Sequence, residues 1–316
     1  MRPGGESTGS TSLSWDAGAL RKGGRLHAYM RLVRIEHTIF SLPFAYVGAL
    51  LSGYPFTLAD AILMAAAVVG LRLAGMAYNN IADLDIDRLN PRTMRRPLVV
   101  GAVTMREAWA IVALGSAIYF ASAALLNKYA LLLSPLVLAI ALTYPHAKRI
   151  HPLPHLHLGV VLGSVVFGGA VAASGDEASS LAEVLRSVPW LYVAAVSLWV
   201  AGFDTIYSIM DIDFDRNHGL KSIPAAIGEK GALAASLAMH AASIALFAMG
   251  VEAYDLGAIA TASTALTASV IILVQTMAWL GRVKESFNLN LAVPILIGIG
   301  IIIDTLQHKL RFFSDG

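Results

Sequence analysis

The chain has 316 residues, of which 57% are hydrophobic and 14% are charged, and its mean hydropathy is +0.66. An ordinary soluble domain carries about 25% charged residues, so this composition excludes a typical water-soluble protein and indicates an integral membrane protein. The absence of cysteine excludes disulfides, thiolate metal sites and cysteine nucleophiles, and a net charge of +2 gives no reason to expect a nucleic-acid partner.

The first part of the chain differs from the rest. Residues 1–24 are rich in Gly, Ser and Thr and contain no apolar core segment. This composition is typical of a flexible tail rather than of a cleaved signal peptide. We therefore expect a single transmembrane domain over residues 25–316.

From there, long apolar runs alternate with short segments that contain Pro, Gly and charge. Because about 20 apolar residues are needed to cross a bilayer, we predict an all-α, polytopic membrane protein with nine transmembrane helices. In chain order, the predicted spans cover residues 37–54, 58–80, 105–125, 129–145, 155–174, 189–210, 231–250, 254–280 and 289–307.

The distribution of basic residues supports this count. Nine spans place 18 of the 23 Lys and Arg residues on the side of the N-terminus and four on the other side, with Arg72 inside a span. Loops on the cytoplasmic side of membrane proteins carry the excess of Lys and Arg. The N-terminus is therefore predicted to be cytoplasmic.

The second span ends in a row, or stripe, of side chains that carry oxygen atoms. Asn79, Asp83 and Asp87 follow one another at intervals of four. Residues four apart on an α-helix differ by about 40° in direction, so these three share a face, whereas Asp85 points about 200° away from Asp83.

The sixth span ends in a second stripe. Asp211 and Asp215 lie about 20° to either side of the direction of Asp204, while Asp213 lies about 180° from it. Asp204 is two turns deeper, about 10 Å by helix rise. Carboxylates at the ends of spans can form a solvated cap, but an ionisable group at this depth is costly unless it faces a cavity or a partner.

If both stripes face one cavity on the cytoplasmic side, their repulsion must be neutralised by protons or by a cation. Oxygen ligands without His or Cys at ligand spacing favour Mg²⁺, which binds through one or two carboxylates, waters and phosphate oxygens. The predicted metal ligands are Asn79, Asp83, Asp87, Asp211 and Asp215.

Basic residues on the same side suit a phosphorylated partner. Those nearest the stripes, and therefore the predicted phosphate contacts, are Arg92, Arg96, Lys148 and Lys221. Their alternative role is to set the membrane orientation. Arg72 lies about 20° from the direction of Asp83 and roughly 16 Å deeper, either as a counter-ion of Asp204 or as a substrate contact.

A transporter for a divalent cation or an organic anion is the alternative from another class, because intramembrane carboxylates also mark ion pathways. A translocation path needs polar groups that continue to the far side of the membrane. The loops predicted there offer little besides Asp176, Glu177 and Glu183. The sequence therefore favours a site that opens on one side.

Several ordered segments after residue 30 carry a resemblance to a known family. They are the run from Asn79 to Asp87, with Asn80 in place of the usual aspartate; RTMRRPL from Arg92; YPHAKRIHPLPHLHLG from Tyr144, with His155 in place of glutamine; and DTIYSIMDIDFDRNHGLKSIPAAIG from Asp204. On these segments the chain resembles the UbiA superfamily of intramembrane prenyltransferases, and most of all its 4-hydroxybenzoate polyprenyltransferase branch.

The resemblance implies nine helices around a central cavity, two Mg²⁺ ions that bridge carboxylates and diphosphate, and a lateral opening to the bilayer for the prenyl tail. It also implies transfer of a prenyl group from a prenyl diphosphate to an aromatic acid such as 4-hydroxybenzoate, as in quinone biosynthesis. The segment RIEHTIFSLPFAYVGALL resembles transferases of futalosine-type menaquinone synthesis, and haem, chlorophyll-type rings or glycerol phosphates are further acceptors within the superfamily.

For such a reaction, Tyr144 joins the expected diphosphate contacts. Either Asp204 or Tyr207 is expected to accept the released proton or to orient the phenol. Arg34, His37 and Arg72 are candidates for contacting the acceptor carboxylate, although Arg34 and His37 could instead be interfacial anchors.

Overall fold

The computed structural model describes residues 24–314, apart from the side chains of residues 35–39 and 308–314, and within this range every regular element is helical. The prediction of an all-α fold is thus confirmed. The elements are α2 (Gly24–Val33), α3 (Ile35–Leu51), α4 (Leu58–Ala82), α5 (Leu84–Asp87), α6 (Met105–Leu126), α7 (Lys128–Ile150), α8 (Pro154–Ser174), α9 (Leu181–Ser187), α10 (Trp190–Tyr207), the 3-10 helix η1 (Ser208–Asp211), α11 (Ile212–Asn217), α12 (Ile223–Ala253), α13 (Ala258–Trp279), α14 (Val283–Leu289) and α15 (Ala292–Ser314).

The number of long spans is one lower than predicted. Over residues 24–34 and 40–307, eight helices are long and apolar enough to cross a membrane, and Phe40–Leu51 is a shorter apolar stretch. The first predicted span ran to residue 54, but α3 ends at Leu51, just before Gly53 with its φ of +80°. The chain is therefore a multi-pass membrane protein, and α3, with 17 residues, lies at the lower limit of the roughly 17–25 residues that span a bilayer.

Local sequence signals account for several helix starts. Thr57 and Thr104 each begin a long helix with a reciprocal capping box, in which the threonine oxygen accepts from the backbone N–H three residues later. In return, the carboxylates of Asp60 and Glu107 each accept the N–H of the threonine at 2.7 Å. These bonds satisfy N–H groups that a helix end leaves without partners.

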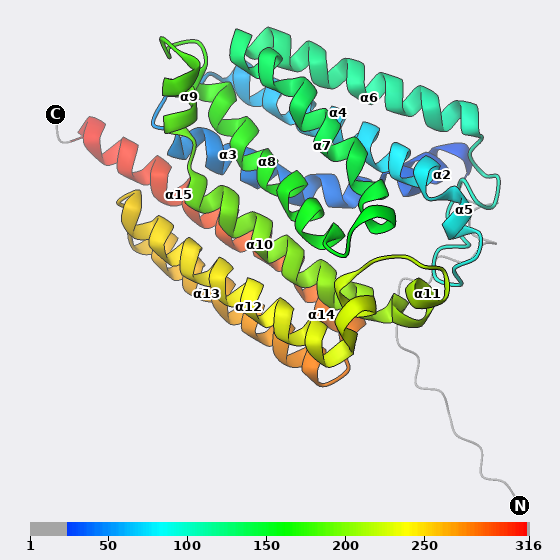
Figure 1. Ribbon diagram of the computed structural model, residues 1–316. Helices are drawn as coiled ribbons and strands as arrows, with labels where there is room; N and C mark the ends of the chain where they lie inside the picture. Colours follow the sequence, from blue (N-terminus) through cyan, green and yellow to red (C-terminus); the bar gives the residue numbers. More distant parts are fainter. Residues whose placement is uncertain (1–23, 315–316) are drawn as a thin grey trace, which may run out of the picture.

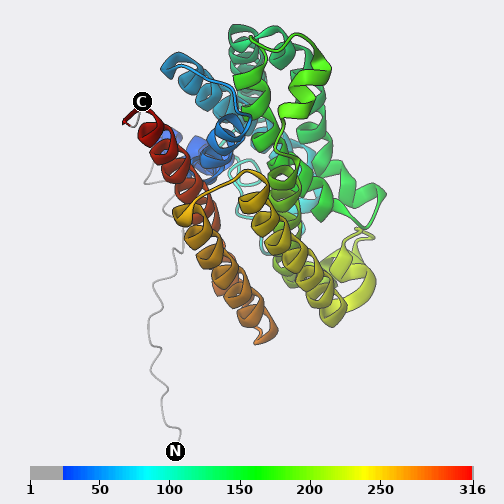
Figure 2. The ribbon, with the colours of Figure 1, turned by 90° about the vertical axis from the view of Figure 1, so that its left-hand side faces the viewer.

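The long helices run alongside one another in a single bundle (Figures 1 and 2). Their contacts form a closed circuit from α3 through α4, α7, α8, α10, α12, α13 and α15 back to α3, while α6 packs on the outside against α4 and α7. The short elements α5 and α11 lie at one end of the bundle, and α9 lies at the other end (Figure 1).

The backbones of α3 and α8 approach each other closely. A Cβ atom added at Gly48 would lie 1.9 Å from the carbonyl oxygen of Val166, and one added at Gly169 would lie 1.9 Å from that of Ala45. Small residues allow helix backbones to approach this closely in a membrane. Both glycines lie in the second halves of their helices, so the bundle is closed there and remains open toward α5 and α11.

Candidate active site

The open end of the bundle leads into a cavity of about 340 Å³. Side chains from α3, α4, α7, α8, α10 and the α14–α15 junction line this cavity, together with residues of α5 and α11. Both predicted acidic stripes reach it, because its wall contains Asn79, Asp83, Asp87, Asp204, Asp211 and Asp215. Segments more than 100 residues apart in the sequence therefore present their carboxylates to one space.

The backbone that carries these carboxylates differs from the two continuous helices that the spacing assumed. Asp83 is the C-cap of α4, and a separate short helix follows it. Asp211 ends the 3-10 helix η1, and Asp215 lies on α11. The expected alternation nevertheless holds, since the side chain of Asp85 is 67% exposed and Asp213 is exposed.

Three of the cavity carboxylates are paired with basic side chains that the sequence also singled out. The pairs are Lys148 Nζ with Asp83 Oδ2 at 2.7 Å, Arg96 Nη1 with Asp87 Oδ2 at 2.5 Å, and Arg92 with both carboxylate oxygens of Asp211, its Nε lying 3.0 Å from Oδ1. The cavity mouth thus combines charges of both signs, and each of these three carboxylates has a cation beside it.

Burial and charge shift the ionisation of the groups at this mouth. Burial raises the pKa of the Asp87 carboxyl, and the charge of Arg96 offsets only part of that effect. Burial lowers the pKa of the Arg92 guanidinium, but the hydrogen bond and charge of Asp211 outweigh it, so the pKa is raised overall. Arg92 therefore remains a permanent cation at the entrance.

The donor set fits a hard cation that is held jointly with a phosphorylated partner. Oδ1 of Asp83 is buried and has no hydrogen-bond partner, and the guanidinium of Arg149 lies 4.0 Å from it. Among the described residues, no three His, Cys, Asp or Glu side chains are close enough to hold a metal by themselves. Mg²⁺ needs only one or two carboxylates when waters and phosphate oxygens complete its shell.

Two polar residues support Asp211 and Asp215, although the sequence reasoning did not select them. Asn90 Nδ2 donates to Asp211 Oδ1 at 3.1 Å, and Ser222 Oγ donates to Asp215 Oδ2 at 2.8 Å. Both residues line the cavity. Asn90 lies between the first acidic stripe and Arg92, and Ser222 is the N-cap of α12, so neither falls on a periodic face that would have revealed it.

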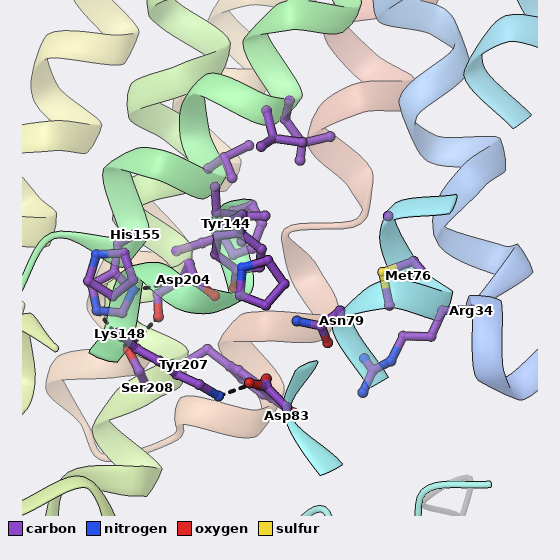
Figure 3. A pocket seen from close by; sticks show the side chains of 18 of the residues that line it. Arg34, Met76, Asn79, Asp83, Tyr144, Lys148, His155, Asp204, Tyr207 and Ser208 are labelled. Atoms are coloured by element: carbon purple, nitrogen blue, oxygen red, sulfur yellow. Dashed lines mark hydrogen bonds and ion pairs between the residues drawn. The ribbon is translucent and has the colours of Figure 1, made fainter. Parts of the chain in front are cut away.

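Deeper in the cavity, Asp204 pairs with His155 and not with Arg72. Oδ2 of Asp204 lies 2.7 Å from Nδ1 of His155, and Figure 3 shows both side chains together on one wall. Tyr144 and Tyr207 lie nearby on that side. The alternative in which Arg72 is the counter-ion of Asp204 is therefore not supported, although Arg72 does line the cavity.

An aromatic wall separates this charged region from the apolar interior. The Tyr207 ring lies under the Arg92 guanidinium, 4.8 Å from its carbon, and its centroid is 4.4 Å from that of Phe287. Phe287 in turn packs against Phe203, and Phe203 against Trp199. All of these residues line the cavity, so its surface changes from cationic to aromatic with depth.

The remaining predicted contacts divide into three groups. Arg34, Arg72 and Tyr144 line the cavity, and Arg34 has a left-handed backbone with φ of 47° at the start of α3. Lys221 does not line it, because its ammonium group donates to the carbonyl of Ile150 at 2.8 Å. The predicted phosphate contact of Lys221 is thus unsupported, and the side chain of His37 lies outside the described residues.

Asn80 has a structural position rather than a place in the cavity wall. The residue is 5% exposed, and its Nδ2 donates to the carbonyls of Leu32 at 3.2 Å and Met76 at 2.8 Å. This amide joins α4 to the end of α2, where helix carbonyls lack intrahelical partners. An aspartate, which the superfamily pattern usually has here, could not donate these bonds when ionised.

The fold and site together define a polytopic membrane protein with a charged cavity that opens at one end of the bundle and combines carboxylates, guanidinium groups and an aromatic wall. The UbiA prenyltransferase family model matches residues 41–291. The chain belongs to this family, as its sequence motifs indicated, and it is therefore a prenyltransferase.

Individual relatives agree with this assignment. The chain is 32% identical over 228 residues to a 4-hydroxybenzoate octaprenyltransferase of Cupriavidus necator, a match that covers 71% of this chain and 77% of that protein. It is 34% identical over 200 residues to a 4-hydroxybenzoate octaprenyltransferase of Actinobacillus pleuropneumoniae, with 62% of this chain and 65% of that protein covered.

Solved structures show the same fold. An apo UbiA homolog from Aeropyrum pernix K1 is 90% identical and has a TM-score of 0.84, with 85% of this chain and 98% of that chain covered. A UbiA homolog from Archaeoglobus fulgidus bound to GPP and Mg²⁺ is 20% identical and has a TM-score of 0.61, with 87% and 99% covered. At 20% identity, the second match supports the fold alone.

Proposed function

We propose that this enzyme transfers a prenyl group from a prenyl diphosphate to a ring carbon of an aromatic acid such as 4-hydroxybenzoate, with Mg²⁺ as cofactor. The observation that carries the proposal is the meeting of two acidic segments, with Asp83 and Asp211 as their representatives, beside guanidinium groups in one membrane cavity. Residues 25–316 act as one unit in this reaction.

The relatives support this choice of substrates. Two of them are named 4-hydroxybenzoate octaprenyltransferases, and a protein of the same fold binds GPP and Mg²⁺. Membership of a prenyltransferase family also favours an enzyme over the transporter considered above. Other acceptors, such as a naphthoate, a haem or a glycerol phosphate, are alternatives that an acceptor panel would reveal.

In this proposal the diphosphate binds at the cavity mouth. Arg92, Arg96, Tyr144 and Lys148 contact its oxygens, while Asp83, Asp87, Asp211 and Asp215, with Asn79, hold two Mg²⁺ ions. When bound, Mg²⁺ neutralises negative charge on the diphosphate as the leaving group departs. Fixed guanidinium groups act in the same direction, because they stabilise the charge that develops in the transition state more than the ground state.

The remaining chemistry depends on the deeper walls. The aromatic side chains exclude water from the allylic cation that forms when the carbon–oxygen bond breaks. The acceptor ring must be held within about 3–3.5 Å of that carbon, with its carboxylate toward Arg34 or Arg72. Asp204 or Tyr207 then accepts the ring proton or orients the phenol.

The cavity mouth is proposed to face the cytoplasm. The loops at this end of the bundle carry most of the Lys and Arg residues of the chain, as expected for the cytoplasmic side. A cysteine introduced at exposed Asp213 in the otherwise cysteine-free chain gives a direct check. Labelling of this cysteine by an impermeant reagent from the cytoplasmic side only is the expected result, and labelling from the opposite side would contradict the proposed orientation.

A purified-enzyme assay tests the reaction. The protein is incubated with geranyl diphosphate, Mg²⁺ and 4-hydroxybenzoate, and prenylated product is measured by mass spectrometry. Asp83→Ala and Asp211→Ala should remove activity, whereas Asp213→Ala should retain it, because the Asp213 side chain is exposed. Full activity in both of the first two variants would refute the metal assignment, and product from none of a panel of aromatic acids would refute the acceptor class.

A further inference from the structure

His155 and Asp204 form an acid–imidazole contact in the cavity wall. His155 lies in the first turn of α8 and Asp204 in the last turn of α10. The His155 side chain is 3% exposed and that of Asp204 is 20% exposed, and both line the cavity. The imidazole thus lies behind the carboxylate, while the carboxylate retains access to the cavity (Figure 3).

The surrounding hydrogen bonds indicate where the protons of this pair are. One proton lies between Nδ1 of His155 and Oδ2 of Asp204, because two lone pairs would repel each other at the 2.7 Å that separates these atoms. Nε2 lies 3.4 Å from Oγ of Ser208. The hydroxyl of Ser208 is directed to the backbone carbonyls of Asp204, at 2.7 Å, and Thr205, at 3.1 Å.

Since Ser208 has one hydroxyl proton, its oxygen presents lone pairs to Nε2. A neutral imidazole with its proton on Nδ1 would oppose those lone pairs with a lone pair of its own. A proton on Nε2 converts this contact into a hydrogen bond. The geometry therefore favours a proton on Nε2; with the shared proton on Nδ1, the pair is an imidazolium beside a carboxylate, joined by a charge-assisted hydrogen bond.

We propose that His155 is a positioning residue that keeps Asp204 ionised and directs its free oxygen at the aromatic acceptor. This inference rests on the proposed function. It adds that Asp204, one of the two proton acceptors proposed there, depends on His155. Sequence comparison alone would not assign this role, because glutamine usually occupies the position in the superfamily pattern. Glutamine can donate one hydrogen bond but carries no charge.

The proposed prenyl transfer needs no reactant other than the prenyl diphosphate and the aromatic acceptor. The bond between the first prenyl carbon and the diphosphate oxygen breaks, and its electron pair leaves with the diphosphate. A ring carbon of the acceptor supplies the pair for the new carbon–carbon bond. The proton on that ring carbon passes to Asp204, which restores the aromatic ring, and Asp204 then releases the proton to water at the cavity mouth.

An isotope effect distinguishes this role from simple packing. Turnover of 4-hydroxybenzoate is compared with that of the same acid deuterated on both carbons ortho to the hydroxyl, for the unsubstituted enzyme and for His155→Gln and His155→Ala. The matched control is His157→Gln, since His157 lies on the same helix but contacts the carbonyl of Ile140 and does not line the cavity.

Loss of the imidazolium should slow proton removal. We expect kcat to fall by roughly 100-fold in His155→Ala, within the range of a positioned acid–base group, and less in His155→Gln. The isotope effect on kcat should rise above that of the unsubstituted enzyme in both variants, with KM for the prenyl diphosphate unchanged. A slow variant without a larger isotope effect, or variants as active as the His157 control, would overturn the proposal.

A second measurement does not depend on turnover. Protein with ¹⁵N-labelled histidine is reconstituted in lipid vesicles, and solid-state NMR reports whether both ring nitrogens of His155 are protonated, with His155→Gln used to assign the signal. We expect an imidazolium that becomes neutral in Asp204→Asn. A neutral ring in the unsubstituted protein would overturn the proposed pair, whereas an imidazolium in a protein that prenylates no aromatic acid would refute only the proposed function.

Discussion

Replacing Asn80 with aspartate restores the residue that the superfamily pattern usually has, yet the structure predicts that the substitution damages this protein. The side chain is 5% exposed, and its amide donates to two carbonyl oxygens, those of Leu32 and Met76. Asn80→Asp replaces the donor with a nearly isosteric acceptor, so two hydrogen bonds become two contacts between acceptors.

The cost follows from these contacts. Each lost hydrogen bond contributes about 1 kcal/mol net, and a buried polar atom left without a partner costs about 1–3 kcal/mol. Together these losses lower the free energy of unfolding by roughly 3 kcal/mol. With about 2–4 °C for each kcal/mol in a large domain, the midpoint of thermal unfolding should fall by roughly 6–12 °C.

The assay is thermal unfolding of the purified protein in detergent, followed by tryptophan fluorescence. Asn79→Asp is the matched control, because Asn79 lines the cavity and its oxygen already accepts from Arg96 at 3.4 Å, so a carboxylate there gains a cation. If Asn80→Asp unfolds at the same temperature as this control, the argument that Asn80 serves as a buried donor is wrong.

Three further outcomes are expected. Arg92→Lys should raise KM for the prenyl diphosphate, because lysine lacks the forked donors with which a guanidinium contacts phosphate oxygens; an unchanged KM would contradict a phosphate role. Asp304→Asn should lower the unfolding temperature, because losing the charge weakens the hydrogen bonds that this carboxylate accepts. Its donors are the N–H groups of Gly257, Ile259 and Ala260, at 2.7, 3.1 and 3.2 Å. The control is Asp255→Asn, since Asp255 is exposed. Removal of divalent cations with a chelator should abolish prenyl transfer without loss of helical circular dichroism, and added Mg²⁺ should restore it; persistent activity would exclude a required metal.

Much of the fold could be predicted from the sequence, because the requirement that a membrane-spanning helix be apolar applies to each short stretch of chain. Apolar runs between polar segments located the helices to within a few residues at many boundaries; for example, α6 was predicted as residues 105–125 and spans Met105–Leu126. The end of the first span was predicted three residues too late, since α3 ends at Leu51 and the backbone turns at Gly53.

That the two acidic stripes face one cavity could also be predicted, because residues four apart share a helix face, and both stripes do line one cavity. The exposed positions of Asp85 and Asp213 confirm that reasoning. The expected phosphate contact of Lys221 has no support in the structure, because nearness in sequence to an acidic stripe does not fix the direction of a long side chain, which here reaches the carbonyl of Ile150 at the end of α7.

The sequence by itself thus determined an all-α membrane protein, the approximate position of its helices and most of the acidic and basic residues that line the cavity, because these depend on local composition and helical period. Only the tertiary structure decided which cation faces which carboxylate, that His155 rather than Arg72 is the partner of Asp204, and that Asn80 faces α2 instead of the cavity. Those pairings join residues that are distant along the chain, and their geometry is set by how the helices pack.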